Sequence, residues 1–315
     1  MSEPPYRLQD LGDRRMLTVG GRDYATAYSA RVVRMLVDRK GPARTPPYLS
    51  YKETRGRFFL DPLFAYLRGR GAQDMSVLEV GCSFGHVTEY LAGRPEVRDV
   101  TTFDTDPAFV AIVRVKVEEM GLDRVKEVRL FSNEETRRLP YPDGRFDLVV
   151  VLGVVEHLPV RGRRQIVDEY YRLLAPGGHI TILDTPNRYF PLETHSVGLP
   201  LVQWLPARLA YAYAKVARPG RLRGVDYAGF VMDGVGWRNA SLGECLPSSG
   251  LRDLEDVTEA AGYGWRFFRD TARSRTRRAL LPAFGLVCAG LARLGRPPSL
   301  ALPYLNLVLG KRGTR

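Results

Sequence analysis

The feature that most limits the fold is a glycine-bounded turn between a buried apolar run and a helical pattern. Residues 77–80 (Val-Leu-Glu-Val) lead into the pentapeptide 81–85 (Gly-Cys-Ser-Phe-Gly), after which apolar side chains recur at helical spacing at Val87, Tyr90 and Leu91. Glycine lets the backbone turn sharply and approach a ligand with no side chain between them, and a helix start adds free N–H donors. The stretch therefore predicts a strand, a tight turn and a helix, with a small polar ligand at the turn.

Three known motifs compete for this turn. The pentapeptide fits the G-x-S-x-G nucleophile elbow of serine hydrolases, in which Ser83 would be the nucleophile and Asp184 and His195 its partners. Against this reading, no His-Gly-Gly string precedes Ser83 to supply oxyanion donors. The turn also half-matches the dinucleotide pattern G-x-G-x-x-G, but Ser83 and His86 stand where its second and third glycines belong. With Glu79 two residues before the first glycine, the string resembles motif I of the class I S-adenosylmethionine-dependent methyltransferases.

A second strand, predicted at residues 100–104, ends in an acidic residue that suits cofactor binding. Asp104 lies 19 residues beyond Gly85, where Rossmann-like sheets place a carboxylate that accepts both ribose hydroxyls. The alternative is an ordinary helix-capping acid, but Asp106, directly before Pro107, is better placed for that task. We therefore predict that Asp104 binds ribose and that a helix begins near Pro107.

The resemblance becomes specific further along the chain. After a predicted third strand at 127–131, the run 139–149 (Leu-Pro-Tyr-Pro-Asp-Gly-Arg-Phe-Asp-Leu-Val) is similar to a signature of class I methyltransferases, and its turn at 142–144 leads into a fourth strand that ends at Leu152. The Glu-His-Leu string at 156–158 and the Leu-x-Pro-Gly-Gly string at 174–178, joined by an amphipathic helix at 163–174, resemble the same family. From residue 77 to 186 the match is nearly continuous, over about a third of the chain.

This resemblance implies a fold and a cofactor. The fold expected is α/β, a Rossmann-like seven-stranded sheet with six parallel strands and an antiparallel last strand, helices on both faces, and a lid insertion after strand five. The cofactor is S-adenosylmethionine, with the turn at its methionine end, Glu79 orienting that end, and an acid four residues before Leu139 at the adenine amino group. The expected cofactor contacts are Glu79, Gly81, Cys82, Ser83, Gly85, Asp104, Glu134, Glu135 and Leu152.

Methyl transfer to an oxygen also needs a base, and two histidines are the candidates. The sulfonium donor is already activated, so the protein supplies mainly positioning and proton removal. His157 follows strand four and His195 lies in the insertion, and histidine has the side-chain pKa nearest neutrality. A structural hydrogen bond at a helix start is an equal alternative for His157. Some relatives bind a divalent metal through Glu-x-x-Glu-His, but Gly153 replaces the first Glu here, so no metal is expected.

The sequence divides into four parts. A helical cap at 1–75, with helices near 24–37 and 58–67 and no clear strand pattern, precedes the cofactor-binding core at 76–186; Tyr51 and Arg55 in the cap are weak candidates for ligand contact. An aromatic, proline-rich insertion at 187–250 is interpreted as a substrate lid. Residues 251–315 complete the core, with a helix at 251–261, strand six at 265–270, and a last strand at 306–311 that runs antiparallel between strands five and six.

Charge and cysteine content bear on location and partners. Three separated cysteines suggest reduced thiols in the cytoplasm, and the amino terminus has no apolar signal region. The formal net charge is +12, and residues 266–315 hold ten Arg and one Lys against one Asp, which leaves +10. Such basicity is typical of a solvated arginine-rich face, of a nucleic-acid partner or of an anionic membrane. No known nucleic-acid-binding module accompanies this basic segment, so nucleic acid is not the expected partner. An RNA-associated methyltransferase is kept as the alternative function.

The insertion at 272–303 within the last part contains an unusual helix. Its apolar run, 279–292, has fourteen residues, which is too few to span a bilayer. Arginines at 273–278 border it, so it is either a core or lid helix or an element that contacts a membrane surface through 273–292. We expect a cytoplasmic O-methyltransferase, peripheral to the inner face of the membrane in the second case, that acts on a small-molecule, glycan or lipid-linked acceptor.

Overall fold

The computed structural model describes residues 6–232, 237–272 and 275–313. The chain forms two compact units, residues 1–131 and 132–315. Strands from both contribute to one seven-stranded sheet, whose order is β6-β5-β4-β7-β8-β10-β9. Six of these strands are parallel, and β10 is antiparallel to both of its neighbours. The predicted fold class is confirmed, and the last strand, β10, lies beside β8 as expected, but its other neighbour is β9 and not the strand predicted at 265–270.

The first unit begins with a small sheet that the sequence did not indicate. Strands β1 (Arg7–Asp10), β2 (Arg15–Val19) and β3 (Arg22–Thr26) pair antiparallel. The segment predicted as a helical cap, residues 1–75, therefore also contains strands. The strands are short and rich in charged residues, which hides the alternation of polar and apolar side chains. The signal that could have revealed them was the pair Gly20 and Gly21, whose φ values of 56° and 72° suit the turn of a two-residue hairpin.

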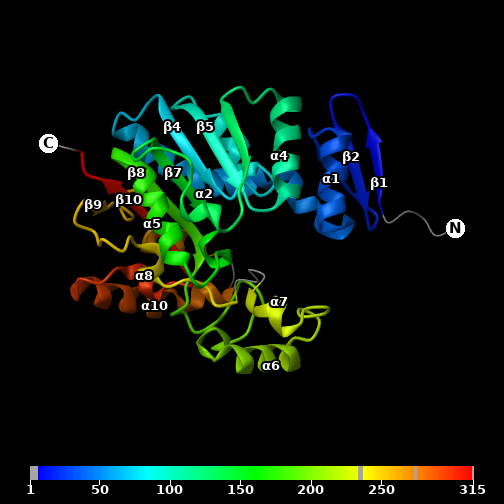
Figure 1. The fold of residues 1–315 in the computed structure, drawn as a ribbon. Helices are drawn as coiled ribbons and strands as arrows, with labels where there is room; N and C mark the ends of the chain where they lie inside the picture. Colours follow the sequence, from blue (N-terminus) through cyan, green and yellow to red (C-terminus); the bar gives the residue numbers. More distant parts are fainter. Residues whose placement is uncertain (1–5, 233–236, 273–274, 314–315) are drawn as a thin grey trace. The chain divides into compact units, whose positions relative to one another are not determined.

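Helices α1 (Ala30–Lys40) and α2 (Arg57–Gly69) follow this sheet. The first starts six residues later than predicted, because residues 22–26 pair in β3 and the Ser29 hydroxyl accepts a hydrogen bond from the Val32 N–H as an N-cap. Its apolar face packs on α4, and Figure 1 shows the two helices side by side. The short helices between α1 and α2 are η1 (Pro42–Arg44), η2 (Pro46–Ser50) and the π-helical η3 (Lys52–Gly56).

Three parallel strands complete the first unit. They are β4 (Met75–Val80), β5 (Val97–Asp104) and β6 (Val125–Leu130), with helices α3 (His86–Ala92) and α4 (Pro107–Met120) between them. Every residue of β4 is buried, as expected for a central strand of a parallel sheet. The turn at 81–85 thus leaves the carboxyl end of a fully buried strand, where open α/β sheets bind their ligands.

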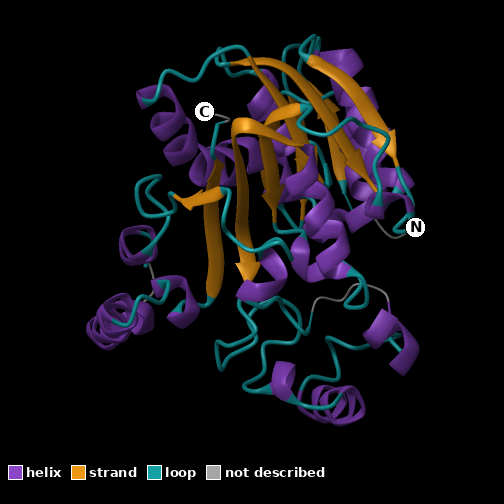
Figure 2. Cartoon of the chain, turned by 60° about the vertical axis from the view of Figure 1, so that its left-hand side comes forward, coloured by secondary structure: helices purple, strands orange, loops and turns teal. Residues whose placement is uncertain are grey.

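The second unit supplies the other four strands, which Figure 2 shows among the strands coloured orange. They are β7 (Phe146–Leu152), β8 (Leu174–Pro186), β9 (Leu254–Asp256) and β10 (Tyr304–Lys311), with α5 (Arg163–Leu173) between the first two. Strand β8 includes the Leu-x-Pro-Gly-Gly string at 174–178. The 3-10 helices of this unit are η4 (Glu135–Arg137), η5 (Val155–His157), η6 (Val202–Trp204) and η7 (Pro298–Ala301).

Two predicted elements near the carboxyl end are wrong. The expected strand at 265–270 is helix α9 (Trp265–Asp270), and the expected helix at 251–261 instead contains strand β9. Aromatic residues favour strands locally, but in α9 helical spacing brings Phe268 to within 5.3 Å of the Phe284 ring of α10. Strand β9 forms because its backbone pairs with β10.

The insertion after β8 has its own core. Helices α6 (Ala207–Ala217), α7 (Tyr227–Met232) and α8 (Leu242–Cys245) lie in it, and the rings of Phe230 and Trp237 stack at 4.8 Å. The long apolar run falls in α10 (Arg275–Arg293). Within the described ranges, we find no helix with the length and apolar character needed to cross a membrane.

Candidate functional site

The glycine turn is held by backbone hydrogen bonds to the neighbouring strand. The N–H groups of Gly81 and Cys82 both donate to the carbonyl oxygen of Phe103, at 3.0 and 2.9 Å, and the Gly85 N–H donates to the Cys82 carbonyl at 2.8 Å. Three residues of the turn have positive φ: Gly81 (75°), Ser83 (46°) and Gly85 (77°). A serine in this region is strained, and such strain is often found at ligand sites.

Gly85 is required for a second reason. A Cβ atom at this position would lie 3.0 Å from Cγ2 of Val113 on α4. Glycine therefore lets the start of α3 pack directly on α4. The combination of positive φ and close packing explains why the turn ends on this residue.

Asp104 is bound to the turn, so the structure brings these two predicted sites together. One carboxylate oxygen, Oδ2, accepts a hydrogen bond from the Ser83 N–H at 2.9 Å, and Oδ1 accepts from the N–H groups of Thr105 and Asp106 at 2.7 and 3.0 Å. Burial raises the pKa of Asp104 above its ordinary value, against these bonds. Asp106 is the cap of α4, as predicted, and its Oδ1 accepts from the Ala108 N–H at 2.8 Å.

Glu79 lies beneath the turn with one oxygen satisfied and one not. Its Oε2 accepts a hydrogen bond from the Thr88 hydroxyl at 2.6 Å, whereas Oε1 is buried and has no hydrogen-bond partner among the described residues. Burial raises the pKa of Glu79 to about 8. An orphaned carboxylate oxygen next to a glycine turn suits a cationic donor from a ligand, and the ammonium group of a bound methionine moiety fits that need.

His86 is a residue that the sequence reasoning missed. Both of its ring nitrogens are buried without a hydrogen-bond partner among the described residues, and burial lowers the pKa of the imidazole to about 3. The ring contacts Tyr51 edge-on at 5.5 Å between centroids. The available signal was its position directly after the turn. A neutral imidazole here can donate to, or accept from, a polar ligand.

A buried charge network supports the turn from behind. The Lys116 ammonium donates to the Phe84 carbonyl oxygen at 2.9 Å and forms an ion pair with Glu89. The Tyr28 hydroxyl donates to Glu89 at 2.9 Å, so the amino-terminal cap takes part. Burial lowers the pKa of Lys116 and raises that of Tyr28. Because Lys116 lies among apolar residues of its helix, its role is visible only in the tertiary structure.

The predicted adenine contacts, in the second unit, make local bonds. Glu135 is exposed, and its Oε2 accepts from the Ser132 N–H at 2.7 Å, which lowers its pKa. Glu134 accepts a hydrogen bond from Arg137 at 3.3 Å. Leu152 is the last residue of β7 and is half-buried. Glu134 and Glu135 follow the carboxyl end of β6, and Leu152 is the carboxyl end of β7. A role of these residues in binding adenine stays a prediction.

The side chains of the two predicted catalytic histidines, His157 and His195, are in contact. Their Nε2 atoms lie 3.1 Å apart and the rings are edge-on, although 38 residues separate them in the chain. Glu156 is buried beside them, with an oxygen 4.0 Å from the His157 Nε2. Donor atoms of all three side chains lie within 4.8 Å of one another, so the cluster could relay a proton or coordinate a divalent ion such as zinc.

Glu193 holds the loop that carries His195, and it too was missed. Its side chain is fully buried and accepts four backbone hydrogen bonds of 2.6 to 2.9 Å. The donors are the N–H groups of His195, Ser196, Val197 and Gly198. A carboxylate with this many backbone donors needs no cationic partner and fixes the local chain conformation. The turn-rich composition of the insertion gave no hint of this anchor.

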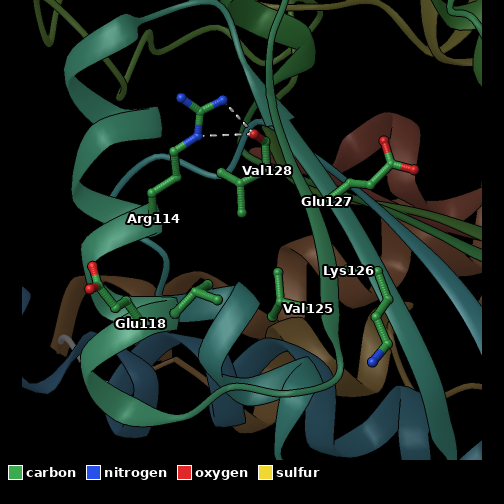
Figure 3. A pocket seen from close by; sticks show the side chains of 7 residues that line it. Arg114, Glu118, Val125, Lys126, Glu127 and Val128 are labelled. Atoms are coloured by element: carbon green, nitrogen blue, oxygen red, sulfur yellow. Dashed lines mark hydrogen bonds between the residues drawn. The ribbon is translucent and has the colours of Figure 1, made fainter.

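A hollow between α4 and β6 contains none of the predicted site residues. Figure 3 shows Arg114 beside it, with the guanidinium donating to the Val128 carbonyl oxygen at 3.2 and 2.9 Å. The other side chains around it are Val117, Glu118, Val125, Lys126 and Glu127. It carries no convergent set of polar groups, so we do not consider it a functional site.

Comparison with known proteins relates the central part of the chain to a protein family. A family model described as a methyltransferase domain matches residues 77–178, the segment that holds the turn, Asp104, Glu135 and His157. Residues 77–178 thus match a methyltransferase domain, which supports the resemblance to the class I S-adenosylmethionine-dependent methyltransferases. This family uses S-adenosylmethionine as its cofactor, and the orphaned Glu79 oxygen and the glycine turn fit that molecule.

Individual relatives match the same region. A phosphatidylethanolamine N-methyltransferase of Cereibacter sphaeroides is 36% identical over 120 residues, which are 38% of this chain and 54% of that protein. A ubiquinone biosynthesis O-methyltransferase of Pseudomonas paraeruginosa is 29% identical over 153 residues, 48% of this chain and 62% of that protein. The chain thus spans less than two thirds of these relatives. A solved methyltransferase from Aquifex aeolicus has a TM-score of 0.35 and 24% identity, covering 51% of this chain and 82% of that one.

Proposed function

We propose that this protein transfers a methyl group from S-adenosylmethionine to an oxygen of a small-molecule, glycan or lipid-linked acceptor. The observation that carries the proposal is the turn at 81–85, fixed to Asp104 and placed over the buried Glu79 within a matched methyltransferase domain. When bound, S-adenosylmethionine supplies an electrophilic methyl group that needs no covalent enzyme intermediate. The protein's work is therefore binding, positioning and proton removal.

In the first unit, we assign three tasks to the residues of the turn and its neighbours. The backbone of 81–85 holds the methionine end, and Glu79 accepts a hydrogen bond from its ammonium group through Oε1. Asp104 has one acceptor position left on Oδ2 after its three backbone bonds, and it takes a ribose hydroxyl. His86 supplies a neutral donor or acceptor at the same turn.

In the second unit, we assign proton removal to the histidine pair. Neutral His157 or His195 takes the proton of an acceptor hydroxyl, and the second imidazole accepts a share of the resulting charge across their 3.1 Å contact. Glu156 adds a negative charge that stabilises an imidazolium. The Glu193 anchor holds His195 in place, so the pair does not depend on a flexible loop.

The class of acceptor rests on the relatives. The names of several of them refer to ubiquinone, demethylmenaquinone, tocopherol and phosphatidylethanolamine, which are all lipids, and two of these names specify O-methylation. A hydroxyl acceptor also agrees with a histidine base, since an amine acceptor has less need of one. We therefore favour an oxygen acceptor on a lipid-linked or small hydrophobic molecule.

The test is calorimetric titration with S-adenosylmethionine, S-adenosylhomocysteine and NAD, followed by an assay for S-adenosylhomocysteine formation with phenolic, glycan and lipid-linked acceptors. We expect the first two ligands to bind and NAD not to bind. Binding of NAD alone would overturn the proposal. Failure of all three ligands would also overturn it and would return Ser83 to consideration as a nucleophile.

A further inference from the structure

Two helices of the second unit expose apolar side chains that a folded protein normally buries. On α10 and directly after it, Leu280, Leu286, Val287 and Leu294 are 47%, 76%, 53% and 76% exposed. On α6, Leu209 and Val216 are 59% and 84% exposed. Single exposed leucines are common, but rows of them mark an interaction surface.

Three of the four exposed apolar residues at α10, and both of those on α6, share one face of their helix. Leu280, Val287 and Leu294 are spaced by seven residues, which is close to two helical turns, so their side chains line up along α10. Leu209 and Val216 have the same spacing on α6. Other faces of both helices are already used, because Cys288 of α10 and Ala210 and Ala214 of α6 are buried. The exposed rows are thus a second apolar face on each helix.

Basic residues accompany both rows, and acidic residues do not. Arg275, Arg293 and Arg296 are exposed at the two ends of α10, and Arg208 and Lys215 are exposed beside the row of α6. From residue 271 to the end of the sequence there is no Asp or Glu, and none occurs from 207 to 217. Arg273 lies outside the described residues, as does the side chain of Arg277. A partner for these helices is therefore both apolar and negatively charged.

The two helices lie along the same part of the second unit. In Figure 1 α6 and α10 both run across its lower part. Neither can cross a bilayer, but helices with an apolar row and basic flanks lie in the headgroup region of anionic membranes. We propose that α6 and α10 form a docking surface for an anionic phospholipid bilayer.

This proposal does not depend on methyl transfer. A surface for anionic lipid would be present whatever the acceptor is, and vesicle binding needs neither cofactor nor acceptor. Together with the proposed function, it would bring the enzyme to acceptors that reside in the bilayer. The two proposals can fail separately, because cofactor binding is measured in the absence of vesicles.

The experiment is flotation of the full chain with vesicles of phosphatidylcholine and with vesicles of equimolar phosphatidylcholine and phosphatidylglycerol. We expect binding to the anionic vesicles only, weakening as salt is raised. The variant Arg275→Gln/Arg293→Gln/Arg296→Gln should lower the partition coefficient by about fivefold for each charge removed. The variant Leu280→Gln/Val287→Gln/Leu294→Gln should weaken binding at every salt concentration, because it removes the apolar row of α10 and leaves only that of α6.

A matched control uses exposed residues of the same unit outside these helices. The variant Leu251→Gln/Arg252→Gln removes an exposed leucine and an exposed arginine and should leave vesicle binding unchanged. All substituted side chains are exposed, and circular dichroism checks that each variant is folded. The proposal is overturned if wild type fails to float with anionic vesicles, or if the control loses binding as the α10 variants do. A dimer in sedimentation that the apolar α10 variant disrupts, without vesicle binding, would assign the rows to a second copy instead.

Discussion

Asp104 Oδ2 accepts a hydrogen bond from the backbone N–H of Ser83 at 2.9 Å, so the end of β5 and the turn after β4 are one structural element. The strained φ of 46° at Ser83 is held in place by this bond. A substitution of Asp104 thus has two effects, one on the conformation of the turn and one on the binding of a ligand that donates to the remaining lone pair of Oδ2. A pair of ligands with and without ribose hydroxyls separates these effects.

We expect Asp104→Ala to weaken binding of S-adenosylhomocysteine by tenfold or more, about 1.4 kcal/mol, because a hydrogen bond to a charged acceptor is lost. The diagnostic measurement compares this ligand with its 2′,3′-dideoxyribose analogue by calorimetry. Wild type should prefer the parent ligand, and Asp104→Ala should not distinguish the two. Asp106→Ala is the control, since it removes the α4 cap at a cost of about 1 kcal/mol in stability but should keep the preference. Equal preference in wild type would show that Asp104 does not bind ribose.

We expect Gly85→Ala to be more damaging than Gly121→Ala. Both glycines have positive φ, 77° and 61°, and both substitutions cost about 1 to 2 kcal/mol of backbone strain. Only at Gly85 would the new Cβ meet a neighbour, Val113 at 3.0 Å, whereas Gly121 has open space. Overpacking should add about 1 to 3 kcal/mol, measured by urea unfolding. The double variant Gly85→Ala/Val113→Ala should recover part of this loss, and no recovery would argue against the clash.

The raised pKa of Glu79 makes stability depend on pH in a defined direction. Its pKa is about 8 in the folded chain against an ordinary value of 4.5, so the native state holds a proton that the unfolded state has lost between these values. Stability from this group is complete below about pH 4.5 and is lost as pH rises to about 8, with a slope of up to about 1.4 kcal/mol per pH unit. We expect the difference in unfolding free energy between wild type and Glu79→Gln to fall over this window and to level off above it. A difference that is constant with pH would contradict the buried protonated state.

The same carboxyl gives a signature of ligand binding. If the ammonium of S-adenosylmethionine bonds to Glu79, the ligand favours the ionised carboxylate and binding at pH 7 releases a proton. The measured binding enthalpy should then differ between phosphate and Tris buffers in proportion to their ionisation enthalpies. Glu79→Gln should abolish this buffer dependence.

We expect His157→Asn and His195→Asn each to lower kcat by about 10² to 10⁴-fold, while the affinity for S-adenosylmethionine changes little, because proton removal acts on the acceptor. The double variant should lose no more than the worse single variant, since the pair acts as one unit across its 3.1 Å contact. Unchanged kcat in both variants would remove the pair from the mechanism.

Metal removal distinguishes two uses of this cluster. Dialysis against a chelator should leave kcat unchanged if the histidines act only as bases. If activity is lost and returns with zinc or magnesium, Glu156, His157 and His195 coordinate an ion. The metal content measured by mass spectrometry should then be lower in His195→Asn than in wild type. Glu193→Gln tests the anchor, because it should lower kcat through a misplaced His195 without removing any donor of the cluster.

Several features could be predicted from sequence because they depend on local chemistry. The apolar run before Gly81 and the position of Asp104 at the end of the next strand indicated the cofactor half of the fold, and Asp106 before Pro107 indicated the α4 cap. These signals depend on a few neighbouring residues, and the parallel arrangement then follows from alternating strands and helices. The strand at 265–270 failed because aromatic residues suit strands as well as a helix that packs on α10.

The sequence by itself indicated the methyltransferase resemblance of residues 77–186, the order of the core elements and the turn, because glycine spacing and buried strands restrict the backbone directly. Only the tertiary structure decided which side chains meet. The contact of His157 with His195, the support of Phe84 by Lys116 and the anchoring of the loop by Glu193 depend on residues brought together by folding. Exposure of the apolar rows on α6 and α10 was likewise invisible in the sequence, because an apolar residue does not state which face of its helix the rest of the chain will cover.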